Sequence, residues 1–178
     1  MRRRLTLAFV GPESTAKTTL SHWVASRLKV PWIEEAAREY LRPSGRNYCR
    51  KDVLRMGLLQ LESETSVLAK CPLVVSDTHV LVYHVWMLDK FKEDSLVFHD
   101  ILLGRSDIFY ILTAPDIEWV FDPLREDPHR RHLIFRMYQR EITRFRLPHH
   151  IVRGQGEARY AAVLSILRQL QLPLESNR

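Results

Sequence analysis

One stretch of the sequence, residues 5–20 (LTLAFVGPESTAKTTL), constrains the fold of this chain more than any other. An apolar run, Leu5–Val10, leads into Gly11 and a loop of small residues, and Lys17 then opens an amphipathic segment. This order is typical of a strand, a phosphate-binding loop and a helix. It follows the pattern G-x-x-x-x-G-K-[ST], except that Ala16 replaces the second glycine. The alternative is an ordinary strand-to-helix turn with a lysine in the first helical turn. We interpret the stretch as a nucleotide-binding loop.

The residues of this loop have separate expected roles. Backbone N–H groups after Gly11 are expected to surround the phosphates, while Lys17 reaches the terminal phosphates and the Thr18 hydroxyl binds Mg²⁺. The methyl group of Ala16 fits such a loop if its backbone angles are helical. The expected cofactors are ATP, with GTP as the alternative, and Mg²⁺. The predicted nucleotide-binding residues of the loop are Gly11, Glu13, Ser14, Thr15, Ala16, Lys17, Thr18 and Thr19.

Length and composition predict one globular domain over residues 1–178. No uninterrupted apolar run approaches the roughly 18 residues that cross a membrane, and the apolar segment after the basic start is too short for a signal peptide. Two cysteines are too few for a disulfide framework, so we expect a cytoplasmic location. The spacing of the histidines predicts no zinc site. The formal net charge of +6 favours anionic ligands, without distinguishing a nucleotide from a nucleic acid or a lipid headgroup.

Apolar runs and amphipathic segments alternate along the whole chain. The expected strands are residues 5–10, 32–35, 73–77, 108–112 and 149–152. The expected helices are residues 17–28, 36–41, 53–70, 80–91, 95–103, 116–121, 133–145 and 157–170, with Asp52 as the cap of the third. This alternation predicts an α/β protein with the P-loop NTPase fold, in which a parallel sheet of about five strands is covered by helices on both faces. Ligands bind such sheets at the carboxyl ends of the strands.

Asp77 ends one of these strands. A carboxylate at this place faces the Mg²⁺ that Thr18 would hold, so Asp77 is the second predicted metal-binding residue. Its alternative role, together with Thr78, is to cap the following helix.

Two glutamates, Glu34 and Glu35, end the expected strand 32–35. A carboxylate here accepts the proton of a hydroxyl that attacks the γ-phosphate. We favour Glu35 as this base, with Glu34 as the fallback. The alternative is that one glutamate is a surface charge while the other pairs with Arg38.

Residues 122–131 form a charged, proline-broken segment between the fourth strand and a long helix. Kinases of small molecules carry a mobile lid at this place, and its arginines close over the phosphates. The predicted catalytic arginines are Arg125, Arg130 and Arg131. The alternative is a solvated loop in which arginines pair with Glu126 and Asp127.

Three arginines, Arg136, Arg140 and Arg144, recur every four residues on the expected helix 133–145. Like charges at this spacing repel each other by about 0.2–0.5 kcal/mol, so the stripe suggests an acidic protein partner. The alternative is compensation by Glu141 or other surface acids. No recognised nucleic-acid motif is present, so a nucleic acid is not an expected partner.

Taken together, these motifs resemble the NadR-type kinase domain, a P-loop family of bacterial ribosylnicotinamide kinases and related AAA-like ATPases. The resemblance covers nearly the whole chain. The segments that carry it are Gly11–Thr19, Glu35–Tyr40, Gln60 with Glu64, Asp77 and Thr78 with Trp86, Pro115–Pro128 followed by Arg130 or Arg131, and Gly154 with Arg159.

The resemblance implies ATP-dependent phosphorylation of the 5′-hydroxyl of nicotinamide riboside or a similar nucleoside, a step of NAD salvage. It also implies that Arg125 belongs to the lid and that the loop after Gly154, the last predicted nucleotide-binding residue, borders the adenine. The residues expected near the acceptor are Arg38, His79, Tyr83, Trp86 and Asp122. For the aromatic residues, packing in the core is the alternative.

Four residues depart from the family pattern: Ala16, His79, Tyr83 and Pro123. His79 stands where the family has the second Asp of an Asp-Thr-Asp triplet, and the loss of a carboxylate changes which hydroxyls are bound. The identity of the acceptor therefore stays open. The alternative function is a P-loop ATPase or nucleotide-dependent switch that acts on a protein partner.

Overall fold

The computed structural model describes residues 4–43, 47–121 and 129–172, and it has a single five-stranded sheet at its centre. All strand pairs are parallel, in the order β2-β3-β1-β4-β5. The strands are β1 (Leu5–Val10), β2 (Trp32–Ile33), β3 (Leu73–Asp77), β4 (Ile108–Thr113) and β5 (His149–Val152). This architecture confirms the predicted P-loop NTPase fold.

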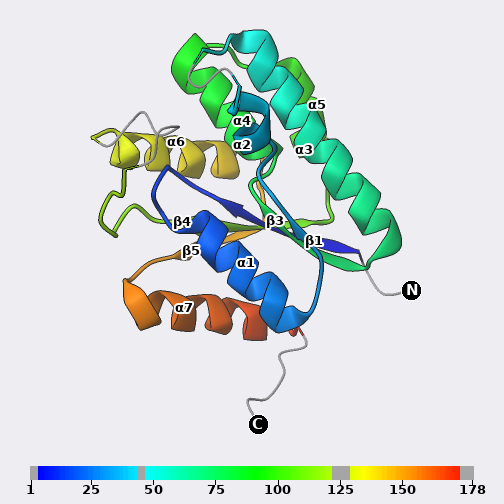
Figure 1. Cartoon of the computed structure of the whole chain (residues 1–178), viewed down its shortest axis with the longest axis vertical. Coiled ribbons are helices and arrows are strands. Elements are labelled where there is room, and N and C mark those ends of the chain that lie inside the picture. Colours follow the sequence, from blue (N-terminus) through cyan, green and yellow to red (C-terminus); the bar gives the residue numbers. More distant parts are fainter. Residues whose placement is uncertain (1–3, 44–46, 122–128, 173–178) are drawn as a thin grey trace.

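Helices cover both faces of this sheet (Figure 1). The first and last helices, α1 and α7, lie on one face, and the others lie on the opposite face or beyond it. The helices are α1 (Lys17–Leu28), α2 (Ala36–Leu41), α3 (Arg50–Lys70), α4 (Val80–Trp86), the π-helical turn η1 (Met87–Phe91), α5 (Leu96–Gly104), α6 (Arg131–Arg144) and α7 (Gly156–Gln169). In the part of the chain that the structure describes, no helix has the length and hydropathy of a membrane span.

The alternation of side chains along β1 divides the core into two layers. Leu7 and Phe9 pack with α1 and α7, while Ala8 and Val10 pack with the helices of the other face. All four are fully buried. Because a central parallel strand is covered on both sides, it reads as a continuous apolar run. This is why the sequence identifies β1 so clearly.

The beginning of α3 differs from the prediction by three residues. The helix starts at Arg50, and Asp52 is not its cap but the third residue of a capping box. The Asp52 carboxylate accepts a hydrogen bond from the backbone N–H of Cys49 at 2.7 Å. A second hydrogen bond, from the Tyr40 hydroxyl at 2.8 Å, ties α2 to the start of α3.

The segment 116–121 is not helical, so this prediction is wrong. Its backbone polar groups have partners outside the segment instead of along a helix. The carbonyl oxygen of Ile117 accepts from Arg131 at 3.0 Å, and the N–H of Val120 donates to Ser14 Oγ at 2.8 Å. These long-range hydrogen bonds replace the i→i−4 bonds of a helix.

The predicted helix 80–91 is also divided. Its last five residues form the π-helical turn η1, which contains the buried Asp89. Such turns are short, and they occur frequently at functional sites. Here the turn places an acidic side chain toward the start of α6.

Candidate functional site

The loop between β1 and α1 is held against the end of β4. Gly11 has φ +141°, and a Cβ atom there would lie 2.6 Å from both the carbonyl oxygen and the Oγ1 of Thr113. Thr113 Oγ1 is also 2.6 Å from Thr15 Oγ1 and donates to the Val10 carbonyl oxygen at 3.1 Å. Only glycine allows this close approach, so Gly11 is required by geometry as well as by the motif.

Ala16 adopts left-handed backbone angles, φ 62° and ψ 26°. Helical angles, the condition under which an alanine fits this loop without strain, are therefore not present at Ala16. For an alanine the left-handed conformation costs roughly 1–2 kcal/mol, whereas a glycine adopts it freely. The structure thus explains why the pattern carries a glycine here and shows that this chain retains the loop despite the strain. Ser14 is a second strained residue of the loop, with φ 52°.

Lys17 lies across the loop. Its Nζ donates to the carbonyl oxygen of Pro12 at 2.7 Å. Thr15 Oγ1 reaches the same oxygen at 2.8 Å, and α1 begins immediately after the loop. The loop therefore has the arrangement that the motif predicts: backbone N–H groups at the start of a helix, with a lysine ammonium group beside them.

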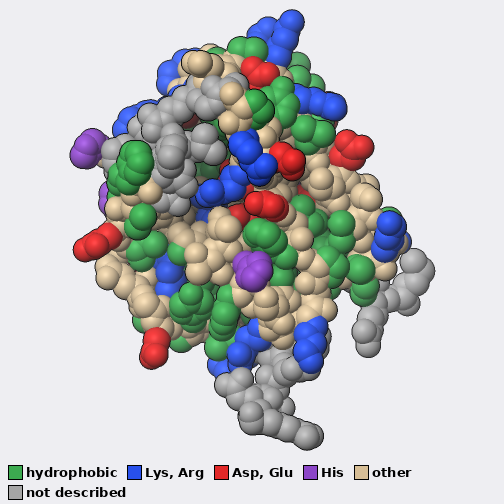
Figure 2. Space-filling model, in the orientation of Figure 1, with side chains coloured by type: hydrophobic (Ala, Val, Ile, Leu, Met, Phe, Trp, Pro, Cys, Tyr) green, Lys and Arg blue, Asp and Glu red, His purple; other side chains and the backbone are tan. Residues whose placement is uncertain are grey.

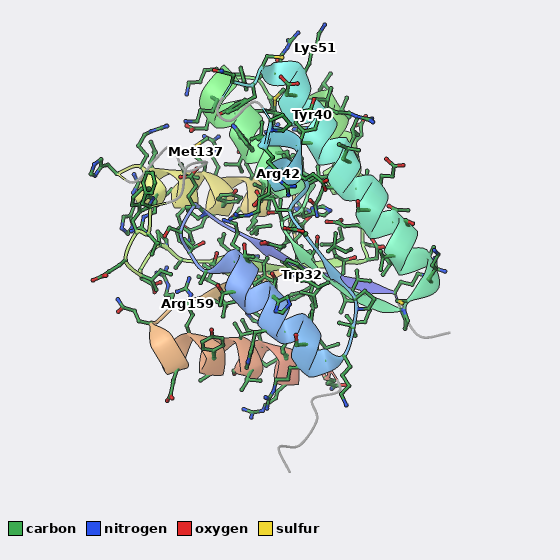
Figure 3. The ribbon with its side chains drawn as sticks, in the orientation of Figure 1. Trp32, Tyr40, Arg42, Lys51, Met137 and Arg159 are labelled. Carbon is green, nitrogen blue, oxygen red and sulfur yellow. The ribbon has the colours of Figure 1, made fainter. Side chains whose placement is uncertain are left out.

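A buried arginine of α7, Arg159, binds the backbone of this loop. Arg159 Nη2 donates to the carbonyl oxygens of Thr15 and Ala114, both at 2.9 Å, and Nη1 donates to Asp116 at 2.6 Å. Arg159 is 3% exposed, between the start of α7 and the loop end of α1 (Figure 3). Asp116 also accepts from the N–H of Gly154 at 2.8 Å. Although burial raises the pKa of Asp116, these two donors bring it below its usual value.

Arg159 and Thr113 have larger roles in the site than the sequence indicated. Arg159 entered the prediction only through the family resemblance. A signal was present, because Arg159 shares the buried face of α7 with Val163, Ile166 and Leu167. A charged residue on an apolar helix face requires buried partners.

Asp77 is fully buried, and neither of its carboxylate oxygens accepts a well-formed hydrogen bond from the described residues. Burial raises its pKa, while the nearby Thr18 hydroxyl and the charges of Lys17 and Arg38 oppose this increase. A buried carboxylate beside a hydroxyl, with its oxygens unused, is an oxygen donor set of the type that Mg²⁺ prefers. Thr18 and Asp77 therefore fit the predicted metal.

Glu35 lies in the same group of charges. Burial, followed by the charge of Asp77, raises the pKa of Glu35 to about 7, against the opposing charges of Lys17 and Arg38. The Nε of Arg38 lies 3.5 Å from Glu35 Oε2, and Glu34 is exposed. The contact between Glu35 and Arg38 that the alternative predicts is thus present. The charge of Arg38 does not outweigh the effect of burial and Asp77 on the pKa of Glu35. Acidic and basic side chains gather near the middle of the face shown in Figure 2.

The predicted lid arginines have different surroundings. Arg131 Nη1 donates to the carbonyl oxygens of Ser14 and Ile117 at 3.1 and 3.0 Å, and burial lowers its pKa. Arg130 forms a two-point contact with Asp89, with Nη1 3.0 Å from Oδ2. The Arg131 side chain thus supports the phosphate loop by binding a backbone carbonyl group of the loop. The Arg130 side chain connects the start of α6 to η1. Arg125, Asp122 and Pro123 lie outside the described residues.

His79 is a core residue in the structure. It is fully buried, its Nδ1 lies 2.9 Å from the Tyr110 hydroxyl, and its Nε2 lies 3.5 Å from Glu64 Oε2. Burial lowers the pKa of His79 to about 3 and raises that of Glu64 to about 8. His79 and Glu64 are therefore in contact as neutral groups at pH 7. Because His79 has no exposed atoms, it does not contact a nucleoside that binds at the surface of the site.

Tyr83 and Trp86, the aromatic residues expected near the acceptor, are stacked with ring centroids 6.3 Å apart. Tyr83 is fully buried, whereas Trp86 is half-buried and donates from Nε1 to the Tyr48 hydroxyl at 3.0 Å. For Tyr83, the alternative of core packing is what the structure shows. Trp86 remains partly exposed.

The basic stripe on α6 is partly compensated within the chain. Arg140 Nε donates to Glu141 Oε1 at 2.9 Å, and Arg144 contacts both Glu141 and Asp94, at 3.1 and 2.8 Å. This is the alternative that the sequence left open. An acidic protein partner stays a prediction, because Arg140 and Arg144 already contact acidic residues of the same chain.

A family model described as AAA domain matches residues 6–159. No curated protein matches the sequence. The structure is similar to that of NadR protein in complex with NAD and AMP-PNP, with TM-score 0.78 and 21% identity over 98% of this chain and 52% of that chain. It is also similar to NadR protein in complex with NR, with TM-score 0.81 and 21% identity over 98% of this chain and 54% of that one.

A smaller protein shows the same fold over its whole length. Deoxyadenosine kinase from M. mycoides with bound dATP aligns with TM-score 0.61 and 14% identity, over 93% of this chain and 100% of that chain. This chain spans about half the length of the NadR chains. At these identities the solved structures establish the fold, and the family model covers most of the sequence. The chain belongs to the family of AAA domains and has the P-loop NTPase fold of a NadR-like domain.

Proposed function

We propose that this chain is a Mg·ATP-dependent kinase that phosphorylates the 5′-hydroxyl of nicotinamide riboside or a similar nucleoside. One observation carries the proposal. Glu35 has a pKa raised to about 7 and lies within electrostatic reach of Asp77 and Lys17, next to the phosphate loop. A base with a pKa close to neutral is well matched to accepting a hydroxyl proton at physiological pH.

Each of the site residues has a separate role in the proposed reaction. Backbone N–H groups of the loop 11–18 bind the phosphates of ATP, and Lys17 Nζ exchanges its contact with Pro12 for an oxygen of the terminal phosphates. Thr18 and Asp77 would hold Mg²⁺, which would supply positive charge to offset that of the ATP phosphates. Glu35 orients the attacking hydroxyl and accepts its proton.

The similar structures support this proposal through their ligands. NadR protein was solved with AMP-PNP and with NR, and deoxyadenosine kinase with dATP. A nucleotide and a nucleoside-type molecule are thus ligands of proteins with this fold. Nicotinamide riboside is the first acceptor to test, because NadR is the similar structure with the higher TM-score.

A coupled assay of ADP release tests the function. The protein is incubated with Mg·ATP and, one at a time, with nicotinamide riboside, adenosine, deoxyadenosine, cytidine, uridine and thymidine. We expect ADP release that depends on one of these nucleosides. ADP release at the same rate with and without every nucleoside would instead support the ATPase alternative, and nucleotide binding without turnover would support the switch.

A further inference from the structure

The candidate base and the candidate metal ligand lie just beyond the last pair of residues that the sheet joins between β2 and β3. The ladder between β2 and β3 ends with Ile33 opposite Ser76, and β2 is only two residues long. Glu35 follows after this ladder has ended, while Asp77 is still part of β3. Something other than strand pairing must fix the distance between the two carboxylates.

One buried side chain joins the two segments. Gln60, from the middle of α3, is fully buried. Its Oε1 accepts from the backbone N–H of Ala36 at 2.9 Å, and its Nε2 donates to Ser76 Oγ at 3.0 Å. Ala36 directly follows Glu35, and Ser76 directly precedes Asp77. The carboxamide therefore spans the gap at the point where the ladder stops.

The orientation of this carboxamide is determined by its neighbours. The N–H of Ala36 only donates, so the oxygen of Gln60 must face it and the nitrogen must face Ser76. Ser76 Oγ then accepts from Gln60 and donates its own hydrogen to Glu64 Oε1 at 2.8 Å. The reversed amide would bring two donors together at Ala36. Each of the three contacts from Ala36 to Glu64 thus has one donor and one acceptor.

We propose that Gln60 is a positioning residue that sets the separation of Glu35 and Asp77. The inference rests on the proposed kinase function for its effect on turnover, but not for its effect on the backbone. Gln60 does not touch the reacting atoms. It acts by holding the first turn of α2 against β3, and a displacement of about 1 Å of a catalytic group is able to cost as much as 100-fold in rate.

The variant Gln60→Met tests the proposal, because methionine has a similar length and shape but neither donates nor accepts strongly. We expect kcat with the best nucleoside to fall about 10–100-fold, while KM for Mg·ATP changes less than about threefold because the phosphate loop is untouched. Leu102→Ala is the control: it opens a cavity in the core at the end of α5, before β4 begins, and should leave kcat unchanged. A Gln60→Met enzyme with the kcat of the control would overturn the inference.

A second measurement does not depend on turnover. Hydrogen exchange of the Ala36 amide should be roughly tenfold faster in Gln60→Met than in the wild type, the factor that corresponds to the loss of one hydrogen bond. In Leu102→Ala it should be unchanged. If Gln60→Met does not fold, Ser76→Ala releases the other end of the same carboxamide, and the same increase is expected. Unchanged exchange would refute the positioning role, whereas a wild type without nucleoside-dependent turnover would refute only the kinase function.

Discussion

Arg159 Nη2 donates to the carbonyl oxygen of Thr15 at 2.9 Å, across a separation of 144 residues. The last helix thereby fixes the backbone of the first loop. The same nitrogen donates to Ala114 at the end of β4, so the guanidinium group joins three segments of the chain. The conformation of the phosphate loop is therefore a property of the whole fold and not only of its motif.

Replacing this arginine should weaken nucleotide binding. In Arg159→Lys the ammonium group cannot hold Thr15, Ala114 and Asp116 together, because it lacks the planar fork of the guanidinium group. We expect the Kd of Mg·ADP, measured by titration calorimetry, to rise about tenfold. Arg168→Lys, at an exposed position of the same helix, is the matched control. Equal Kd values for both variants would show that Arg159 does not support the loop.

Lys17 provides the most direct test of the nucleotide site. Lys17→Ala removes the ammonium group beside the loop, and we expect the rate of ATP turnover to fall at least about 100-fold, as when a transition-state donor is lost. Lys51→Ala, far from the loop on an exposed part of α3, should have no effect (Figure 3). Turnover by Lys17→Ala at the wild-type rate would contradict the assignment of the loop.

The pKa of Glu35, about 7, predicts the pH dependence of the reaction. Below this pH the carboxyl group is protonated and cannot accept a proton, so kcat/KM should rise with pH up to about 7 and then level off. Glu35→Gln should lower kcat/KM and remove this rise. Glu34→Gln tests the alternative base: if it, and not Glu35→Gln, removes the rise, the assignment of the base is wrong.

Ala16 allows a prediction about stability. Because its φ is 62°, Ala16→Gly should relieve backbone strain and raise the free energy of unfolding by up to about 1 kcal/mol, measured by urea denaturation. The same change at Ala161, an exposed position inside α7, should lower it by about 0.5–1 kcal/mol. A loss of stability in both variants would mean that the loop is not strained at Ala16.

The features that the sequence predicted well depend on local patterns. β1 and the phosphate loop follow from one apolar run and one motif, and the parallel sheet follows from the alternation of strands and helices. Glu35 and Asp77 could be predicted because the carboxyl ends of neighbouring parallel strands meet at one edge. Their placement at this edge follows from the strands alone, whereas their separation is the property that we assign to Gln60.

The features that the sequence did not predict depend on contacts between distant residues. The segment 116–121 has a helical pattern, but its polar groups bond to Ser14 and Arg131. His79 lies two residues after Asp77 in sequence, yet its ring turns into the core toward Tyr110. Neither of these is encoded within a few residues.

The central claim is that the γ-phosphoryl group of ATP is transferred to a nucleoside hydroxyl. It is tested most directly by incubating the protein with Mg²⁺, nicotinamide riboside and ATP labelled in the γ-phosphate, and separating the products. We predict that the label appears in a nucleoside monophosphate, for nicotinamide riboside or for another nucleoside of the panel. Label found only in inorganic phosphate, at a rate that no nucleoside changes, would contradict the proposed function.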